Sequence, residues 1–216
     1  MGAVFISAGV SAIKFQGLYK VLIALFASPV IGFIAGFIIL RTILFMAQHA
    51  TPRINDLFRN GQFFTAVGLA FSHGTNDAQK TMGIITLSLI IGGKLGGFTI
   101  PFWVILASAA TMALGTALGG WRLIRTLGGK FYKIRPVHSF ATQLTSALVI
   151  LSASFIGLPV STTQVVSSAI IGVGSAERFG KVRWGVAGDI LTAWIVTIPV
   201  SALFSAGIYW LMNAMK

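Results

Sequence analysis

The sequence contains no cysteine and only four acidic residues among its 216 positions. Without cysteine, disulfide bonds and thiolate metal sites are excluded. No cluster of histidines and carboxylates has the spacing of a metal site, so we expect no bound metal and no cofactor. Charged residues of either sign make up 9% of the chain, too few to give a soluble domain of this length a wetted surface. The sequence therefore predicts that lipid surrounds the chain.

Apolar and basic residues are the abundant classes. Hydrophobic residues make up 56% of the chain, and the formal net charge is +12. The lysines and arginines lie almost entirely between apolar runs, where they report membrane topology rather than a nucleic-acid surface. We expect the lipid bilayer as a partner and no nucleic acid, with a multi-pass location in the plasma membrane or cell inner membrane.

The apolar runs predict an all-α fold, a polytopic membrane helical bundle, because several exceed the roughly 20 residues that cross a bilayer as a helix. We predict a single transmembrane domain, residues 1–216, with these elements: spans at about 21–46, broken 63–91, 98–120, hairpin 137–175 and 184–213. Gly32 and Gly36 are spaced in the first span so that another helix can approach closely. The segment 121–136 carries five basic residues and no acid, which predicts a cytoplasmic loop.

The segment SHGTNDAQK, residues 72–80, interrupts an apolar run with polar side chains. A carboxylate at the bilayer centre costs about 2.5–3.5 kcal/mol on insertion scales, so Asp77 requires a function or a partner. We interpret the segment as a break between two half-helices, where Asn76 and Asp77 hold a cation or a proton. The alternative is structural: one of these two residues caps the second half-helix, and Lys80, one turn away, neutralises the carboxylate.

A second polar segment, GLPVSTTQ at 157–164, divides an uncharged run into the two arms of a re-entrant-type hairpin. Pro159 ends the first arm, and three hydroxyls open the second: Ser161, Thr162 and Thr163. A helix start exposes about four unpaired N–H groups and a positive dipole end, so with these hydroxyls and Gln164 it can bind an oxyanion. The alternative is ordinary N-capping, with hydroxyls that bond back to the backbone.

The remaining ionisable groups give weaker signals. His73 is either a proton relay or a structural hydrogen-bonding group. His49 and His138 lie near predicted helix ends, where an interfacial role is expected. No nucleophile–base pair with a second carboxylate is evident and cysteine is absent, so the sequence does not indicate an enzyme.

The two polar segments, in the longer forms SHGTNDAQKTMGIITLSL and GLPVSTTQVVSSAIIGVG, resemble the second-half signature segments of the inorganic phosphate transporter (Pit) family. The order of the segments, the basic central loop and the final helix fit the same resemblance, which covers essentially the whole chain. The family is similar in plan to carriers with inverted repeats, each repeat supplying one Asn-Asp break and one Ser/Thr-rich hairpin tip. The resemblance therefore implies one half of an inverted-repeat transporter.

The resemblance also implies roles for individual residues. Phosphate would bind at Asn76, Asp77, Ser161, Thr162, Thr163 and Gln164. The candidates for coupling to H⁺ or Na⁺ are Asp77, Asn76 and Gln79. One feature departs from the family, since no earlier Asn-Asp motif and no earlier Ser-rich tip precede the first span. We therefore expect a C-terminal portion, whose complete site needs the missing N-terminal repeat or a second copy.

The function implied by the resemblance is inorganic phosphate symport coupled to H⁺ or Na⁺. A permease of the same architecture for sulfate or another oxyanion is the nearest alternative, because hydroxyl donors bind other tetrahedral anions as well. The second alternative is an inactive fragment or a structural half-subunit.

Overall fold

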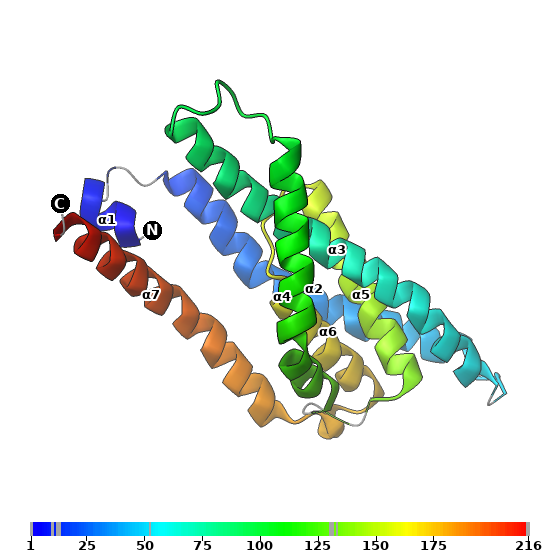
Figure 1. Ribbon diagram of the computed structural model, residues 1–216. Helices are drawn as coiled ribbons and strands as arrows, with labels where there is room; N and C mark the ends of the chain where they lie inside the picture. The colour runs from blue at the N-terminus through cyan, green and yellow to red at the C-terminus, as the bar shows by residue number, and fades with distance from the viewer. Residues whose placement is uncertain are drawn as a thin grey trace. The chain divides into compact units, whose positions relative to one another are not determined.

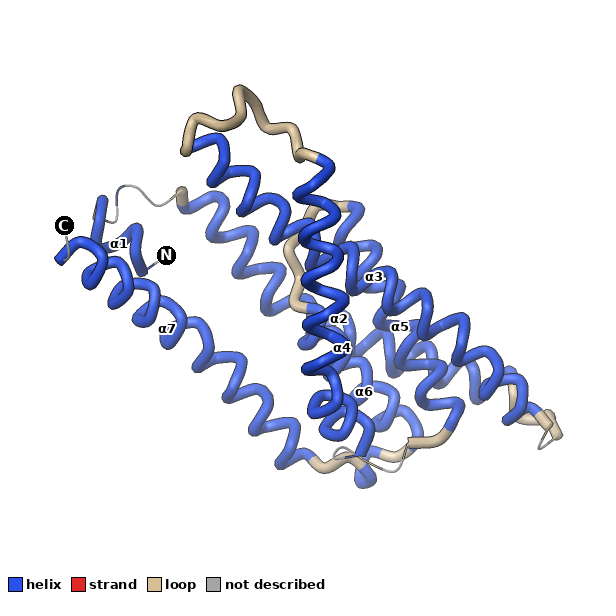
Figure 2. Tube along the Cα trace, viewed as in Figure 1, coloured by secondary structure: helices blue, strands red, loops and turns tan. Residues whose placement is uncertain are grey.

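A computed structural model describes residues 2–9, 11, 14–51, 53–129, 132 and 134–214. Over these ranges the chain forms helices joined by loops and turns, with no β-strand (Figures 1 and 2). The elements in chain order are α1 (Gly2–Ala8), α2 (Phe15–Met46), α3 (Ile54–Ile91), α4 (Phe102–Gly129), α5 (Pro136–Phe155), α6 (Thr162–Glu177), η2 (Phe179–Lys181) and α7 (Trp184–Ala214). The predicted all-α fold is confirmed.

The chain divides into two compact units. One is formed by residues 1–23 and 183–216, which include α1 and α7. In this unit the Ala3 N–H donates to Ser205 Oγ at 3.3 Å, which fixes α1 against α7. The other unit, residues 24–182, holds most of α2 and all of α3, α4, α5, α6 and η2.

Within the larger unit, α3 and α5 lie side by side and run in the same direction (Figure 1). Gln62 Nε2 donates to the Pro136 carbonyl oxygen at 2.8 Å, which joins α3 to the first residue of α5. Further along both helices, Thr65 Oγ1 lies 2.6 Å from Gln143 Oε1. Beside these contacts, apolar side chains of α2, α3, α5 and α6 form a buried core: Leu40, Phe58, Val137, Ala141, Val173 and Ala176.

Helix α2 packs closely against α6 through Gly32 and Gly36, the two glycines predicted to allow another helix to approach. A Cβ atom on Gly32 would lie 2.6 Å from Ser168 Oγ, and one on Gly36 would lie 2.7 Å from the Ala169 carbonyl oxygen. On the α6 side, a Cβ on Gly172 would overlap the backbone of α2. The expectation that small residues allow a close helix approach is therefore confirmed, and the neighbour is α6.

The base of the α5–α6 hairpin is closed by charged and aromatic side chains. Glu177, at the end of α6, pairs with the Arg135 guanidinium, and its Oε2 lies 3.1 Å from His138 Nε2. His138 lies in the first turn of α5, near a helix end as predicted, and at 1% exposure it is buried within the unit. The Tyr132 ring packs at a steep angle against the His138 ring, and burial raises the pKa of the Tyr132 phenol. This network ties the first turn of α5 to the last turn of α6.

The predicted break within 63–91 is not found. Helix α3 is one continuous α-helix of 38 residues. It contains no proline, and its hydroxyls bond to carbonyls one turn earlier: Ser72 Oγ donates to the Gly68 oxygen at 2.7 Å, and Thr75 Oγ1 donates to the Phe71 oxygen. The polar side chains are thus satisfied without interrupting the backbone ladder.

Other boundaries also differ from the predicted ones: α2 begins at Phe15 rather than at about 21, and α3 begins at Ile54 rather than at 63. Helix α4 continues to Gly129, so the first part of the predicted loop 121–136 is helical. Lys130 and Lys133 of that segment lie outside the described residues. The predicted hairpin corresponds to α5 and α6, which are joined by a turn at 156–161.

In the part of the chain that the structure describes, three helical segments are long and apolar enough to cross a membrane, namely Phe15–Met46, Phe102–Trp121 and Trp184–Ala214. In α7 no residue of the most apolar window is buried inside the structure. Apolar side chains cover this helix on all sides, as expected for a segment in contact with lipid or with further protein segments. These helices identify the chain as a membrane protein.

Candidate functional site

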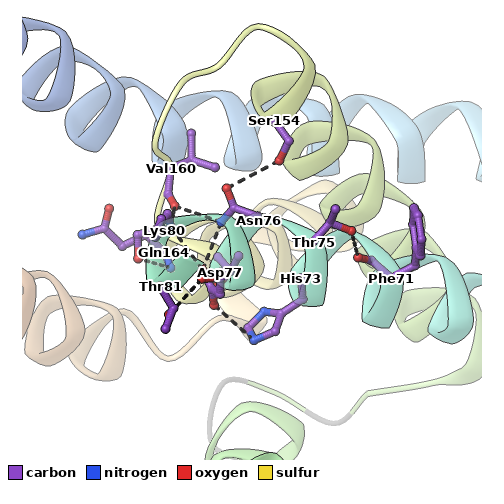
Figure 3. A network of polar contacts seen from close by, with 12 residues as sticks. Phe71, His73, Thr75, Asn76, Asp77, Lys80, Thr81, Ser154, Val160 and Gln164 are labelled. Atoms are coloured by element: carbon purple, nitrogen blue, oxygen red, sulfur yellow. Dashed lines mark hydrogen bonds and ion pairs between the residues drawn. The ribbon is translucent and has the colours of Figure 1, made fainter. Parts of the chain in front are cut away.

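The polar segments predicted from the sequence meet where the middle of α3 faces the turn between α5 and α6 (Figure 3). The turn forms because Gly157 adopts a φ of +72°, which glycine allows at no steric cost. Pro159 has no N–H with which to continue a helix. Ser161 then caps α6: its backbone is extended, and its Oγ accepts the Gln164 N–H at 3.5 Å. The chain thus presents unpaired backbone groups to the side of α3.

Asn76 is the buried centre of the site, at 3% exposure. Its Nδ2 lies 3.1 Å from Asp77 Oδ1 and 3.3 Å from the Val160 carbonyl oxygen. Its Oδ1 lies 3.5 Å from Ser154 Oγ near the end of α5. One amide therefore connects α3, α5 and the turn (Figure 3).

Asp77 is surrounded by donors from two helices. Lys80 Nζ lies 3.1 Å from Oδ1, and His73 Nε2 lies 3.4 Å from Oδ2. Thr162 Oγ1, in the first turn of α6, donates to Oδ2 at 3.2 Å. The structural alternative had two parts. Lys80 does pair with the Asp77 carboxylate, as that alternative predicted. Neither Asn76 nor Asp77 caps a half-helix, because α3 is continuous.

Lys80 reaches from α3 to the turn. Its Nζ donates to the Val160 carbonyl oxygen at 2.7 Å, in addition to its contact with Asp77. The side chain of Lys80 is 39% exposed and that of Asp77 is 28% exposed. Water or a small ion can therefore reach the pair from one side.

The predicted residues of α6 separate into different environments. Thr162 is buried and bonds Asp77, whereas Thr163 is exposed. Ser161 acts as the N-cap, which is the structural reading of the hydroxyl cluster. Gln164 is buried, and within the described part of the chain its Oε1 has no hydrogen-bond partner.

Gln79 is exposed and lines a hollow of about 200 Å³ between α3 and the turn. The remaining lining residues are Asn76, Lys80, Ser154, Gly157, Leu158 and Pro159. The hollow is large enough for a small hydrated ion or a tetrahedral oxyanion, since one water molecule takes about 30 Å³ in the liquid.

Two participants are absent from the sequence-based set. Ser154 contributes a hydroxyl near the end of α5, and Val160 contributes a backbone carbonyl that accepts from both Asn76 and Lys80. A signal for Val160 exists: it stands between a helix-ending proline and an N-cap, where a carbonyl lies outside any helical ladder. Ser154 carries no such signal, because isolated serines are common in membrane helices.

The site combines one carboxylate, one ammonium, one imidazole, one amide and several hydroxyls at the start of a helix. Carboxylate and carbonyl oxygens can hold a proton or a hard cation. The first N–H groups of α6, its hydroxyls and the Lys80 ammonium can hold an anion. Among the described residues, no group of three or more histidine and acidic side chains could form a metal centre.

Comparison with known proteins identifies the family of this chain. The sequence profile of the phosphate transporter family matches residues 45–205, which include both polar segments. The chain belongs to this family. A probable low-affinity inorganic phosphate transporter of Bacillus subtilis (strain 168) is 44% identical over 214 residues, and one of Rhizobium meliloti (strain 1021) is 42% identical over 212.

The matches to these family members cover nearly all of the chain but only part of each relative. They include 98% and 97% of this chain, and the chain spans 64% of the length of both relatives. A solved structure described as the sodium-dependent phosphate transporter has the same fold, with a TM-score of 0.90 at 21% identity. That comparison covers 100% of this chain and 72% of the other. Family members are transporters, so the expectation that the chain is not an enzyme is confirmed.

Proposed function

We propose that this chain carries out, or forms part of, secondary active transport of inorganic phosphate, coupled to H⁺ or Na⁺ and without a cofactor. The names of the relatives support phosphate as the substrate. The observation that carries the proposal is the contact between Asp77 and Thr162, because it joins the carboxylate of α3 to the first turn of α6. The protein acts as a multi-pass protein of the plasma membrane or cell inner membrane.

The chemistry at α6 suits phosphate. The first N–H groups of a helix have no intrahelical acceptor and carry a partial positive charge. The exposed Thr163 hydroxyl adds a donor, the Thr162 hydroxyl becomes available when it turns from Asp77 to the anion, and Gln164 supplies a buried amide. An anion beside ionised Asp77 is unfavourable unless the carboxylate is protonated or holds a cation, so phosphate and the coupling ion bind together.

The proposal includes a second set of binding groups. The inverted-repeat plan expects each of two repeats to supply one Asn-Asp segment and one hairpin tip, and this chain carries one of each. The complete site is therefore formed with a further repeat, either on a longer polypeptide or from a second copy of this chain.

The test is uptake of radiolabelled phosphate by proteoliposomes with and without an imposed H⁺ or Na⁺ gradient. We expect Asp77→Asn to lower gradient-driven uptake by about tenfold or more, because losing a charged hydrogen-bonding group costs about 1.5–3 kcal/mol. Asp56→Asn is the matched control: Asp56 is exposed in the first turn of the same helix and should leave uptake unchanged. Uptake unaffected by Asp77→Asn would contradict the coupling role.

Sulfate is the competing substrate, because N–H and hydroxyl donors also suit this tetrahedral anion. An excess of unlabelled sulfate should leave phosphate uptake unchanged if phosphate is preferred. Strong inhibition by sulfate would favour the general oxyanion permease. Absence of any uptake by the wild-type chain would favour an inactive fragment or structural half-subunit.

A further inference from the structure

The Lys80 ammonium lies between oxygens from two distant parts of the chain. Its Nζ is 2.7 Å from the Val160 carbonyl oxygen and 3.1 Å from Asp77 Oδ1. These oxygens belong to the turn before α6 and to the middle of α3, and Lys80 joins the two. An ammonium has three donors and no acceptor, so two of its three N–H groups can be satisfied by these oxygens.

The same two oxygens would suit a free monovalent cation. Hard cations take carboxylate and backbone carbonyl oxygens as ligands, and unwound carbonyls at membrane helix breaks serve this purpose in transporters. Asn76 Nδ2 contacts both oxygens as well, at 3.1 Å to Asp77 Oδ1 and 3.3 Å to Val160 O. The two oxygens therefore converge on one small region, and a lysine nitrogen occupies it (Figure 3).

Within this chain, the charges around Asp77 leave no excess negative charge for a second cation. The chain has four acidic residues, and Asp77 is the one within the two polar segments. Among the described residues, His73 of the same helix is the other basic group paired with Asp77, at 3.4 Å. A Na⁺ ion between Asp77 and Val160 would have to displace Lys80 from both oxygens and remain next to its positive charge.

We propose that Lys80 acts as a tethered cation, which takes the place of Na⁺ between Asp77 and Val160 and so makes this part of the site indifferent to Na⁺. The proposal rests on the proposed transport function for its biological meaning, but it concerns ion binding and has its own test. Lys80 is in this sense a specificity-determining residue. Removing the ammonium should open a Na⁺ site, whereas a different side chain with a fixed positive charge should keep it closed.

The test compares the melting temperature of the purified full chain in NaCl and in choline chloride at equal ionic strength. We expect Na⁺ to raise the melting temperature of Lys80→Ala by about 3–6 °C, the effect of a ligand well above its dissociation constant. Lys80→Gln, which keeps a donor for the Val160 carbonyl, should respond in the same direction. The wild type and Lys80→Arg should melt at the same temperature in both salts.

A matched control removes a positive charge elsewhere. Lys94→Ala, in the exposed loop after α3, should show no Na⁺ response. The proposal is overturned if Na⁺ stabilises the wild type as much as Lys80→Ala, or if neither Lys80→Ala nor Lys80→Gln responds to Na⁺. Failure of phosphate uptake by the wild type would contradict the proposed function alone, since the melting comparison requires no transport.

Discussion

At the scale of single residues, α2 and α6 can approach closely because the glycines between them have no Cβ atom. A Cβ on Gly172 would overlap the backbone of Phe33, whose position is held by the rest of α2. We expect Gly172→Ala to destabilise the protein by about 1–3 kcal/mol, because the two helices would have to separate. Thermal unfolding in detergent measures this loss.

The matched glycine for this prediction is Gly83 in α3. Apart from the adjoining residues and backbone of its own helix, no atom lies within 4 Å of where its Cβ would stand. Gly83→Ala should therefore be neutral or stabilising by up to about 1 kcal/mol, since alanine favours helix more than glycine does. Equal destabilisation by both substitutions would contradict the packing argument.

The phenol of Tyr132 gives the protein a dependence on alkaline pH. Burial raises its pKa above the ordinary value of about 10, because the charged form is poorly solvated. The stability contributed by the neutral phenol is complete below pH 10 and is lost as the pH rises above it, by up to about 1.4 kcal/mol per pH unit. Tyr132→Phe is the variant for comparison.

We expect the melting temperature of the wild type to fall more steeply between pH 9.5 and 11 than that of Tyr132→Phe. The variant removes only the titrating hydroxyl, which has no hydrogen-bond partner among the described residues. Parallel pH profiles would show that the phenol is not buried as described.

At the scale of elements, the continuity of α3 is directly testable. Residues 72–80 lie within an unbroken helix, whereas 156–161 form a turn. Hydrogen–deuterium exchange should find the amides of 72–80 as slow as their neighbours in α3, and those of the turn faster. Fast exchange at 72–80 would restore the broken-helix interpretation.

The two polar segments illustrate what the sequence could and could not predict about these elements. The hairpin turn was predictable because Gly157 and Pro159 change the backbone itself. The polar run in α3 gave no such constraint: its side chains can be satisfied either by breaking the helix or by partners from elsewhere. Those partners include Ser154 and the Val160 carbonyl, contributed about 80 residues later in the chain, and sequence alone does not place them beside α3.

At the scale of the whole molecule, the positions of the basic residues predict how the larger unit is oriented across the membrane. Helices α3 and α5 start at the same end of the larger unit, and α6 returns to it, so Arg178 and Lys94 lie at opposite ends. Helix α3, with 38 residues, is about 57 Å long, more than the roughly 30 Å of a bilayer core. The end that carries Arg135 and Arg178 is richer in basic residues than the end that carries Lys94, so it is expected in the cytoplasm.

The absence of native cysteine makes this orientation simple to measure. Single substitutions Lys94→Cys and Arg178→Cys introduce one thiol at each end. A membrane-impermeant maleimide should label Lys94→Cys in intact cells and Arg178→Cys only after permeabilisation. Labelling of both from outside would contradict the topology.

The partner shared by Asn76 and Lys80 is a main-chain atom, the Val160 carbonyl oxygen. No side-chain replacement at position 160 can delete it, so a saturation mutagenesis screen would score this position only for the fit of its buried apolar side chain. The screen would thus assign the polar role to neighbouring residues and overlook the oxygen that joins them. Backbone chemistry, such as replacing this amide by a thioamide through protein semisynthesis, is the means to examine it, because sulfur accepts hydrogen bonds more weakly than oxygen.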